Sequence, residues 1–372
     1  MSTEAAFRRE VDYRHTIATL PDIAISPSAV APSPLDASSF KRAITSFALS
    51  GGMVAKALTL AKSRRAGQGL QGSDVVFDRG GPFLDAGRWP PNFTLLGHLW
   101  PFLAAMRAGI PYGLVGETLG EAGNPWSRYL LRSVLNGAEV VGAREEYSLT
   151  AMHKLGVRKA VTMLDNAFWV EPRATDRGRA VLSDNGIRDG EYLAVTCRPW
   201  GDMTPRYLNE LAAGIAALVP SVFPVALIIP TCVNPSGGNP DDRGVGALLA
   251  QRLDDRMAAI PIEADLAPDE LSWLLGNAAL LIGTRLHSLI LGLVGGGRVI
   301  GVSYYGNKTR GVLELLGLGE YVLEIDRFTS AEVVGMSARA LRHQSSTRPR
   351  IEERRVEDDQ ILARAVISAL ER

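Results

Sequence analysis

The feature that most constrains the fold is a repeated alternation of short apolar runs with stretches of helical periodicity. One series extends from Asp74 to Asp165, and a second extends from Tyr192 to Gly317. Continuous apolar runs separated by helices are typical of a parallel sheet that is covered on both faces. Two successive series therefore predict an α/β protein with two doubly wound, Rossmann-like domains, which we expect to face each other across a cleft.

The expected elements follow from the apolar spacing and from the glycines that end several segments. In the first series we expect strands at DVVFD, IPYGLVG, AEVVGA and KAVTML, and helices over 94–108, 125–136 and 144–156. In the second series we expect strands at YLAVTC, FPVALIIP, AALLIG and RVIGVSYY, and helices over 205–219, 241–254, 268–276, 285–294 and 308–317.

A polar, glycine-rich stretch over residues 170–190 separates the two series and predicts the boundary between the domains. Residues 1–40 are rich in Pro, Ser and Ala, and we expect an irregular N-terminal segment there. The first Rossmann-like domain is then expected at 41–172 and the second at 188–345. We expect the charged helical segment at 354–372 to pack back on the first domain.

The composition argues against several classes of protein. The 40 basic and 40 acidic residues give zero net charge, whereas a nucleic-acid-binding protein normally has a basic excess. The two cysteines cannot form a disulfide framework, and no Cys/His spacing indicates zinc, so we expect no bound metal. The most apolar stretch, 278–302, contains Arg285, His287 and Arg298 and is unsuited to spanning a membrane. Because the N-terminus also has no apolar signal core, we expect a cytoplasmic protein.

Ligands of doubly wound sheets bind beyond the carboxyl ends of the strands, so polar residues directly after strands are the candidates for a site. The strand AALLIG ends at Gly283, Thr284 follows as the expected N-cap, and Arg285 and His287 lie in the first helical turn. A helix N-terminus favours anions, and an anionic ligand would explain a basic residue there. The alternative is that Arg285 pairs with a nearby carboxylate and that His287 is a core histidine.

Two further basic residues follow predicted strands. Arg198 comes directly after YLAVTC, and Lys308 opens the helix that follows RVIGVSYY. Each is a candidate contact for an anion in the cleft, and the alternative for each is an exposed, solvated charge.

The first series has weaker candidates. Gly80 and Gly81 follow DVVFD and would let a ligand approach the backbone, although a plain turn is the alternative. Asp165 ends KAVTML, with a turn-forming role as its alternative. Arg144 opens the helix REEYS, where we expect only ordinary helix N-terminal chemistry. The sequence contains no GxGxxG or GxxxxGK[ST] phosphate loop and no GxSxG elbow.

Several of these segments form an ordered set of motifs. An R-x-H-S helix start precedes a strand and then a Tyr and a Lys that open the next helix, here Arg285, His287, Ser288, Tyr304 and Lys308. Upstream lie a strand with Gly-Gly (SDVVFDRGGPFL), an Arg-acid-x-x-Ser helix (GAREEYSLTAMHKLGV), an Asp turn (LDNAF) and a strand ending in Arg (YLAVTCR). In this order, from about residue 73 to 325, the chain resembles the polysaccharide pyruvyltransferase family.

The resemblance implies a fold like that of the GT-B glycosyltransferases, with phosphoenolpyruvate as co-substrate and no other cofactor. The product would be a pyruvyl ketal on a sugar of a surface glycan or glycolipid. Because a glycolipid lies in a membrane, the resemblance also implies peripheral contact of the protein with a membrane. The first domain would be on the acceptor side, and the second would hold the donor. The family's N-terminal Gly-Asn-x-Gly-Asp loop is missing, because Gly51-Gly52 is not followed by Asp.

The resemblance also assigns roles. His287 is expected to be the general acid, and Arg285 acts beside it and binds the donor together with Arg198 and Lys308. Further substrate contacts are expected from Ser288, Tyr304, Gly80, Gly81 and Asp165. Two other functions stay open, namely a GT-B glycosyltransferase that uses a nucleotide sugar and a non-catalytic carbohydrate- or nucleotide-binding protein.

Overall fold

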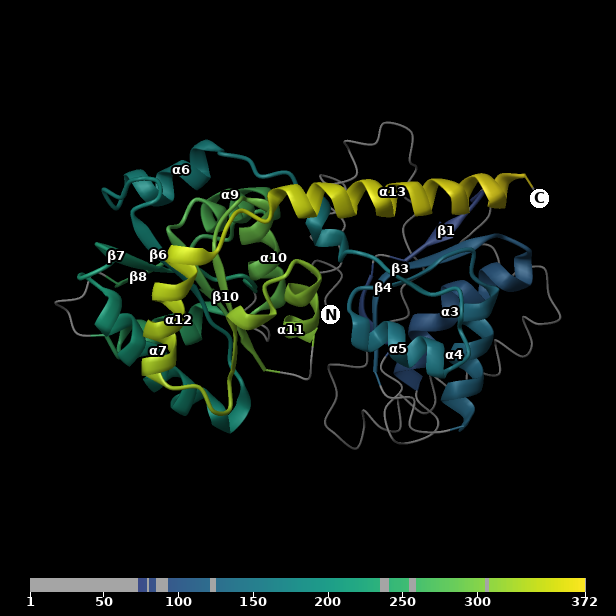
Figure 1. Ribbon diagram of the computed structural model, residues 1–372, viewed down its shortest axis with the longest axis horizontal. Helices are drawn as coiled ribbons and strands as arrows, with labels where there is room; N and C mark the ends of the chain where they lie inside the picture. The colour runs from purple at the N-terminus through teal and green to yellow at the C-terminus, as the bar shows by residue number, and fades with distance from the viewer. Residues whose placement is uncertain are drawn as a thin grey trace. The chain divides into compact units, whose positions relative to one another are not determined.

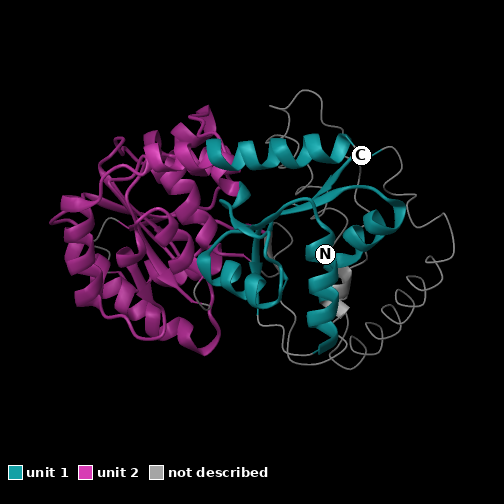
Figure 2. Cartoon of the chain, turned by 45° about the vertical axis from the view of Figure 1, so that its right-hand side comes forward, with its two compact units in different colours: residues 1–166, 356–372 teal, residues 167–355 magenta. Residues whose placement is uncertain are grey.

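The computed structural model describes residues 73–78, 80–84, 93–120, 125–234, 241–253, 259–304 and 308–371. The irregular segment expected over 1–40 lies outside this part of the chain. The elements of the described part are labelled in Figure 1. They form two compact units, of which the first comprises the described residues up to Asn166 and those from Val356 onward, and the second comprises Ala167–Arg355 (Figure 2).

The first unit contains a parallel sheet whose described strands have the order β1-β3-β4-β5, with β2 also paired to β3. Its elements are β1 (Val76–Phe77), β2 (Gly81–Leu84), α3 (Phe93–Ala108), β3 (Tyr112–Leu119), α4 (Pro125–Gly137), β4 (Val141–Ala143), α5 (Glu146–Lys154), β5 (Val161–Thr162) and the C-terminal part of α13 (Arg348–Leu370).

The short strands β1 and β2 pair with successive parts of β3, and the chain bends between them at Gly80. Oδ1 of Asp78 accepts a hydrogen bond from the backbone N–H of Val115 at 2.8 Å. Gly80 has φ +70°, and a Cβ there would lie 2.6 Å from the carbonyl oxygen of Val115. Only glycine suits this conformation and this close approach. The structure thus gives Gly80 a role in the sheet, and Gly81 is the first residue of β2.

Both faces of the first sheet are covered. On one face α3, α4 and α5 contribute to a core that contains Leu99, Leu131 and Met152. On the other face Val115 and Met163 pack against the C-terminal helix α13, through Ile361, Leu362 and Ala365. Both faces are apolar because a parallel sheet buries the side chains of alternate residues on opposite sides.

The second unit contains a parallel sheet with six described strands. They are β6 (Tyr192–Thr196), β7 (Val225–Ile228), β8 (Ala259–Pro261), β9 (Leu280–Gly283), β10 (Val299–Ser303) and β11 (Val322–Glu324). Their order is β11-β10-β9-β6-β7-β8. The chain therefore starts in the middle at β6, extends the sheet in one direction, returns to β9 beside β6, and extends it in the other direction. This is the strand order of a doubly wound dinucleotide-binding sheet.

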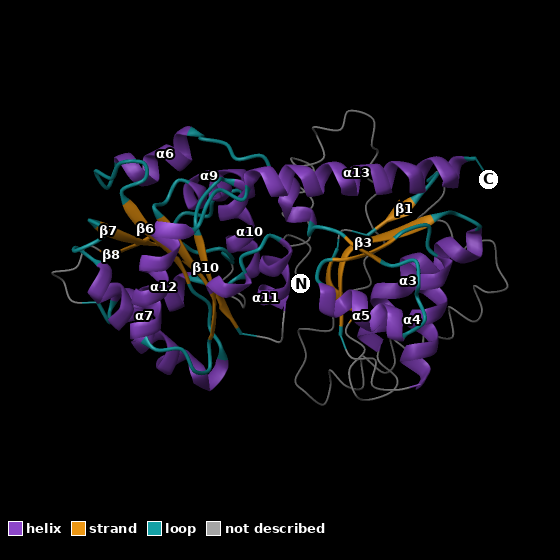
Figure 3. Ribbon diagram, in the orientation of Figure 1, coloured by secondary structure: helices purple, strands orange, loops and turns teal. Residues whose placement is uncertain are grey.

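Helices connect these strands (Figure 3). They are α6 (Asp176–Ser183), α7 (Thr204–Leu218), α8 (Arg243–Ala250), α9 (Pro268–Gly276), α10 (Leu286–Val294), α11 (Lys308–Leu315) and α12 (Ser330–His343), followed by the start of α13. Short 3₁₀ turns lie at Gly201–Met203 and Gly319–Tyr321, and a third, Asn166–Trp169, begins at the last residue of the first unit before the second unit starts. Helix α7 packs against α12, whereas α9 packs against α10 and α6. No helix among those described has both the length and the apolar character needed to cross a bilayer.

The predicted α/β class with two Rossmann-like parallel sheets is confirmed. The arrangement across a cleft stays a prediction. Helix α6 was not expected, because it lies in the polar stretch that we interpreted as the boundary. The polar residues at its start bind Glu270 at the start of α9. The Thr175 hydroxyl caps α6 and donates to Glu270 at 2.6 Å. Arg177 forms an ion pair with Glu270 at 2.6 Å.

Replacing Gly80 with alanine is expected to destabilise the first unit more than the same change at Gly109. Both glycines have φ +70°, but a Cβ at Gly109 would have no atom within 4 Å. Gly109→Ala should therefore cost only the backbone penalty of about 1–2 kcal/mol. Gly80→Ala should cost roughly 1–3 kcal/mol more, because the Cβ is forced against β3. Urea unfolding of the two variants measures this difference, and equal losses would contradict the role assigned to Gly80.

Candidate active site

The strongest candidate site lies where the strand order of the second sheet reverses. Strands β6 and β9 are neighbours, yet the chain leaves their carboxyl ends toward opposite edges of the sheet. The diverging loops leave a crevice at such a switch point, and ligands of doubly wound sheets bind there. Arg198 follows β6 by two residues, and Arg285 follows β9 by two residues. The topology therefore brings these two predicted site residues to neighbouring strand ends.

Buried hydroxyl groups fix the start of α10 against β6. The backbone N–H of Thr284 donates to the carbonyl oxygen of Thr196 at 3.1 Å. The hydroxyls of Thr196 and Ser288 lie 2.7 Å apart, and Ser288 Oγ donates to the carbonyl oxygen of Arg285 at 2.7 Å. Ser288 is fully buried. Its hydroxyl thus holds the first turn of α10 in place, and its predicted contact with substrate has no support in this geometry.

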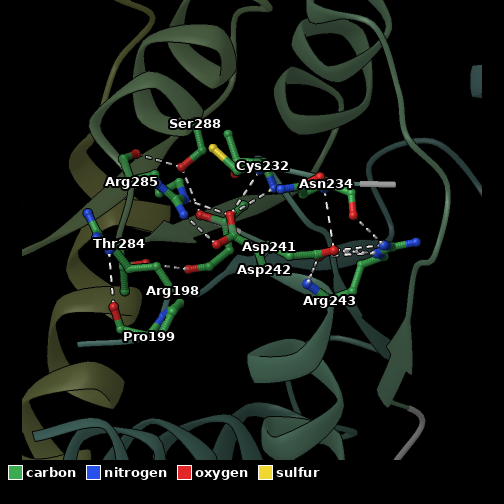
Figure 4. Close-up of polar contacts among 12 residues, drawn as sticks. Arg198, Pro199, Cys232, Asn234, Asp241, Asp242, Arg243, Thr284, Arg285 and Ser288 are labelled. Carbon is green, nitrogen blue, oxygen red and sulfur yellow. Dashed lines mark hydrogen bonds and ion pairs between the residues drawn. The ribbon is translucent and has the colours of Figure 1, made fainter. Parts of the chain in front are cut away.

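The Arg285 side chain forms a two-pronged ion pair with Asp242 (Figure 4). Nε donates to Oδ2 and Nη2 donates to Oδ1, each at 2.6 Å. The Arg285 side chain is 13% exposed and that of Asp242 is 1% exposed. The alternative that Arg285 pairs with a carboxylate is therefore realised. An arginine has five N–H donors, so the Nη1 side of the guanidinium is not used by this pairing.

Asp242 itself is held by the backbone of the loop between β7 and α8. Its Oδ2 accepts hydrogen bonds from the N–H groups of Cys232 at 2.9 Å and Thr231 at 3.3 Å. Its own N–H donates to the carbonyl oxygen of Cys232 at 2.8 Å. These backbone hydrogen bonds fix the Asp242 carboxylate independently of Arg285. The fixed carboxylate in turn orients the Arg285 guanidinium.

The adjacent carboxylate, Asp241, is engaged elsewhere. Arg243 hydrogen bonds to Asp241 at 2.7 Å, and mainly for this reason the pKa of Asp241 is lowered to about 2. Asp241 is thus ionised and paired with its own neighbour, which leaves Asp242 for Arg285. Burial lowers the pKa of Arg285, but the hydrogen bonds to Asp242 and the electrostatic interactions with neighbouring groups together outweigh it, so the pKa is raised overall and the cation is retained.

Arg198 is supported by aromatic rings. Its guanidinium carbon lies 4.2 Å from the ring centroid of Tyr304 and 5.5 Å from that of Trp200. The two rings are themselves 5.0 Å apart. The Tyr207 hydroxyl donates to the backbone carbonyl of Arg198. A guanidinium held over aromatic faces keeps its planar edge available for hydrogen bonding.

The predicted residues of the second unit thus divide into those whose contacts the structure shows and those for which it shows the position and the exposure. Arg198 and Tyr304 are in direct contact, and Arg285 is paired with Asp242. His287 is exposed on the first turn of α10, so the alternative of a core histidine is wrong. Lys308 is half-buried at the first residue of α11, which follows β10. The catalytic and substrate-binding roles of His287 and Lys308 stay predictions.

In the first unit, Asp165 belongs to a buried polar network at the carboxyl ends of β3, β4 and β5. Arg144 Nη1 binds Asp165 Oδ2 at 2.7 Å, and Arg144 Nε donates to Thr118 at 2.5 Å. The expectation that Arg144 has ordinary helix chemistry is wrong, because its guanidinium is buried and neutralised by Asp165 and Glu145. The signal that could have identified Arg144 is its place directly after a strand, the same rule that selected Arg198.

Among the described residues, no group of three or more His, Cys, Asp or Glu side chains could hold a metal ion. Asp242 is the functional residue that the sequence did not identify. It is 43 residues from Arg285 and follows a Pro/Gly-rich loop, and only the strand order brings it close.

The family model of the polysaccharide pyruvyl transferases matches residues 11–306. The chain belongs to the polysaccharide pyruvyl transferase family. It is also similar to the amylovoran biosynthesis protein AmsJ of Erwinia amylovora, with 26% identity over 276 residues, which cover 71% of this chain. The match spans 65% of the length of AmsJ.

Solved structures of sugar-nucleotide enzymes share the fold. HepE of Anabaena, in complex with UDP and glucose, has a TM-score of 0.50 at 14% identity and covers 86% of this chain and 81% of its own. The UDP-GlcNAc 2-epimerase of Methanocaldococcus jannaschii has a TM-score of 0.54 at 12% identity, with 89% and 82% covered. That of Neisseria meningitidis, bound to UDP-GlcNAc, has a TM-score of 0.53 at 13% identity, with 92% and 84% covered. These likenesses support the GT-B-like fold of this pyruvyl transferase family member.

The buried pair predicts that Asp242→Asn and Asp241→Asn differ strongly. Asp242→Asn leaves Arg285 buried without its countercharge, which should cost roughly 3–5 kcal/mol. Asp241→Asn removes a partner from the more exposed Arg243 and should cost about 1 kcal/mol or less. The urea midpoint of the full chain measures both losses. If Asp242→Asn were as mild as its neighbour, Asp242 would not be the residue that holds Arg285.

Proposed function

We propose that this chain transfers pyruvate from phosphoenolpyruvate to a pair of hydroxyls on a sugar, forming a cyclic pyruvyl ketal. Membership of the polysaccharide pyruvyl transferase family supports pyruvate as the transferred group and a polysaccharide as its destination. The relative AmsJ is named for the biosynthesis of amylovoran, which supports an acceptor in polysaccharide assembly.

The observation that carries the proposal is the pair of supported arginines at the switch point. Phosphoenolpyruvate presents a carboxylate and a phosphate, so its site needs convergent cations. The planar guanidinium binds such oxygens in pairs. Arg285 is oriented by Asp242, and Arg198 is held over Tyr304. Because the net charge of the chain is zero, these local cations, rather than an overall field, would attract the anion.

The reaction proposed is an acid-assisted addition followed by a substitution. A proton is added to the methylene carbon of phosphoenolpyruvate, which becomes a methyl group and leaves a cationic centre at C2. One sugar hydroxyl attacks C2 and loses its proton. Phosphate then leaves with its electron pair, and the second hydroxyl attacks C2 and loses its proton to close the ring. One of the two released protons replaces the one consumed, and the other accompanies the phosphate.

His287 is the proposed proton donor. Histidine titrates near neutral pH and can therefore deliver a proton under working conditions. The residue is exposed in the first turn of α10, two positions beyond Arg285, and the proposal requires it to reach the ligand that Arg285 binds. Lys308, at the start of α11, is proposed as an additional contact for the phosphate. This scheme uses acid–base chemistry only, in an enzyme that we place in the cytoplasm with its donor.

The experiment that tests the proposal is phosphate release from phosphoenolpyruvate in the presence of a panel of glycosides and lipid-linked sugars. Acceptor-dependent release, together with a pyruvyl ketal in the product, would support it. Binding of UDP without binding of phosphoenolpyruvate would instead favour a transferase that uses a nucleotide sugar. Binding of phosphoenolpyruvate without release for any acceptor would favour a binding protein.

Two substitutions should separate catalysis from donor binding. His287→Gln should leave donor affinity within a few-fold, yet lower turnover by roughly two to four orders of magnitude, the usual share of a positioned acid. Arg285→Ala should weaken donor binding by about 1.5–3 kcal/mol, the range for hydrogen bonds to charged groups. Calorimetric titration of phosphoenolpyruvate and the phosphate-release assay measure the two effects.

A double variant controls for the carboxylate that Arg285→Ala leaves without its partner. In Arg285→Ala/Asp242→Asn the buried negative charge is gone, so any affinity still missing belongs to the lost arginine. If the double variant regained wild-type affinity, Arg285 would only be neutralising Asp242. If His287→Gln turned over normally, the proton donor would lie elsewhere.

A further inference from the structure

Helix α4 of the first unit presents two aromatic side chains to solvent. Trp126 is 59% exposed and Tyr129 is 67% exposed. Their rings stack, with centroids 6.4 Å apart and an interplanar angle of 27°. The opposite side of the helix is buried through Leu131, Val134 and Leu135. The aromatic pair is therefore on the outer face of a helix that is already anchored to the core.

The exposed side of α4 is also basic. Arg128 and Arg132 are exposed, and α4 contains no acidic residue. Within the part of the chain that the structure describes, neither arginine has an ion pair with a carboxylate. Arg132 lies one turn beyond Tyr129 and is its neighbour on the helix surface, whereas Arg128 lies one turn before Arg132 on the flank of the helix.

Further basic residues lie next to this exposed side. The side chain of Arg132 lies beside Gly156, and Asn136 Nδ2 donates to the Gly156 carbonyl at 3.4 Å. The end of α4 thus borders the turn after α5, where Lys154 and Arg158 are exposed. The acidic residues nearby on these elements are Glu139 and Glu146, fewer than the basic ones. We define the α4 surface as Trp126, Arg128, Tyr129, Arg132, Lys154 and Arg158.

This combination fits one kind of partner. Trp and Tyr are the residues enriched at membrane–water interfaces, where an apolar ring with a polar edge is favoured. Arginine and lysine are attracted to anionic lipid headgroups, and arginine binds phosphate in pairs. The apolar side of α4 is buried in the protein core, so the contacts with the headgroup region would come from the two exposed rings and the basic side chains.

We propose that the α4 surface docks the protein on an anionic lipid surface, with Trp126 and Tyr129 in the interfacial layer and the basic residues against lipid phosphates. The docking is peripheral and independent of the reaction proposed above.

Vesicle co-sedimentation of the full chain tests this proposal. Vesicles of phosphatidylcholine containing about one third phosphatidylglycerol should bind the protein, and pure phosphatidylcholine should bind it several-fold less. Raising the salt from about 0.1 M to about 1 M shortens the screening length from about 10 Å to about 3 Å and should release most of it. Equal binding to both vesicle types, or no binding to either, would overturn the proposal.

Paired variants locate the surface. Arg128→Gln/Arg132→Gln should lower the partition coefficient by about fivefold for each arginine. Trp126→Ser/Tyr129→Ser should lower it by roughly tenfold or more, because apolar area is lost from the interface. The matched controls are Arg188→Gln/Arg342→Gln for charge and Val222→Ser/Leu248→Ser for apolar exposure, all at exposed positions of the second unit. If the controls lowered binding as much as the α4 variants, the lipid contact would not be at α4.

Two readouts keep this test separate from the proposed activity. Phosphate release with a water-soluble glycoside should be unchanged in the α4 variants, whose residues are not part of the switch-point site. The sedimentation coefficient should also be unchanged. If the aromatic variant instead converted an oligomer to a monomer and left vesicle binding intact, the α4 surface would be a contact between copies of this chain, and the proposal would be wrong.

Discussion

The candidate site depends on one buried ion pair, that between Arg285 and Asp242. A buried guanidinium is costly unless a fixed carboxylate neutralises it and satisfies its N–H groups. Here the carboxylate comes from the loop after β7 and the guanidinium follows β9, so the pair ties two strand ends on either side of β6. The backbone N–H groups that hold Asp242 fix it independently of its partner. The pair therefore gives Arg285 a defined direction before any ligand binds.

The sheet topology explains why the cations lie together. A doubly wound sheet that starts at its centre must leave diverging loops at β6 and β9, and Arg198 and Arg285 are on those loops. Each is held by a different device, aromatic faces for Arg198 and a carboxylate for Arg285. A preorganised pair of guanidinium groups loses little conformational freedom when an anion binds. In the function proposed above, the two guanidinium groups would bind the two anionic groups of phosphoenolpyruvate.

The sequence predicted what depends on local pattern and missed what depends on distant contacts. Apolar runs identified the central strands and the strand-end rule selected Arg198 and Arg285, because both follow from periodicity along a short segment. Asp242 could not be paired with Arg285, since only the strand order brings them together. The three-residue edge strands β8 and β11 carry too few residues for a periodic signal. The sequence around Gly80 is compatible both with a bend inside the sheet and with an ordinary loop. Only the close approach of Gly80 to the backbone of β3 shows that it is a bend inside the sheet.

The most direct test of this account is a crystal structure of the wild-type protein grown with phosphoenolpyruvate. The account predicts that the carboxylate or phosphate of the donor contacts the Nη1 side of Arg285, with Arg198 on the other anionic group and Asp242 still paired. A donor bound away from the carboxyl ends of β6 and β9 would contradict it. So would a site that stays empty at saturating phosphoenolpyruvate but accepts UDP.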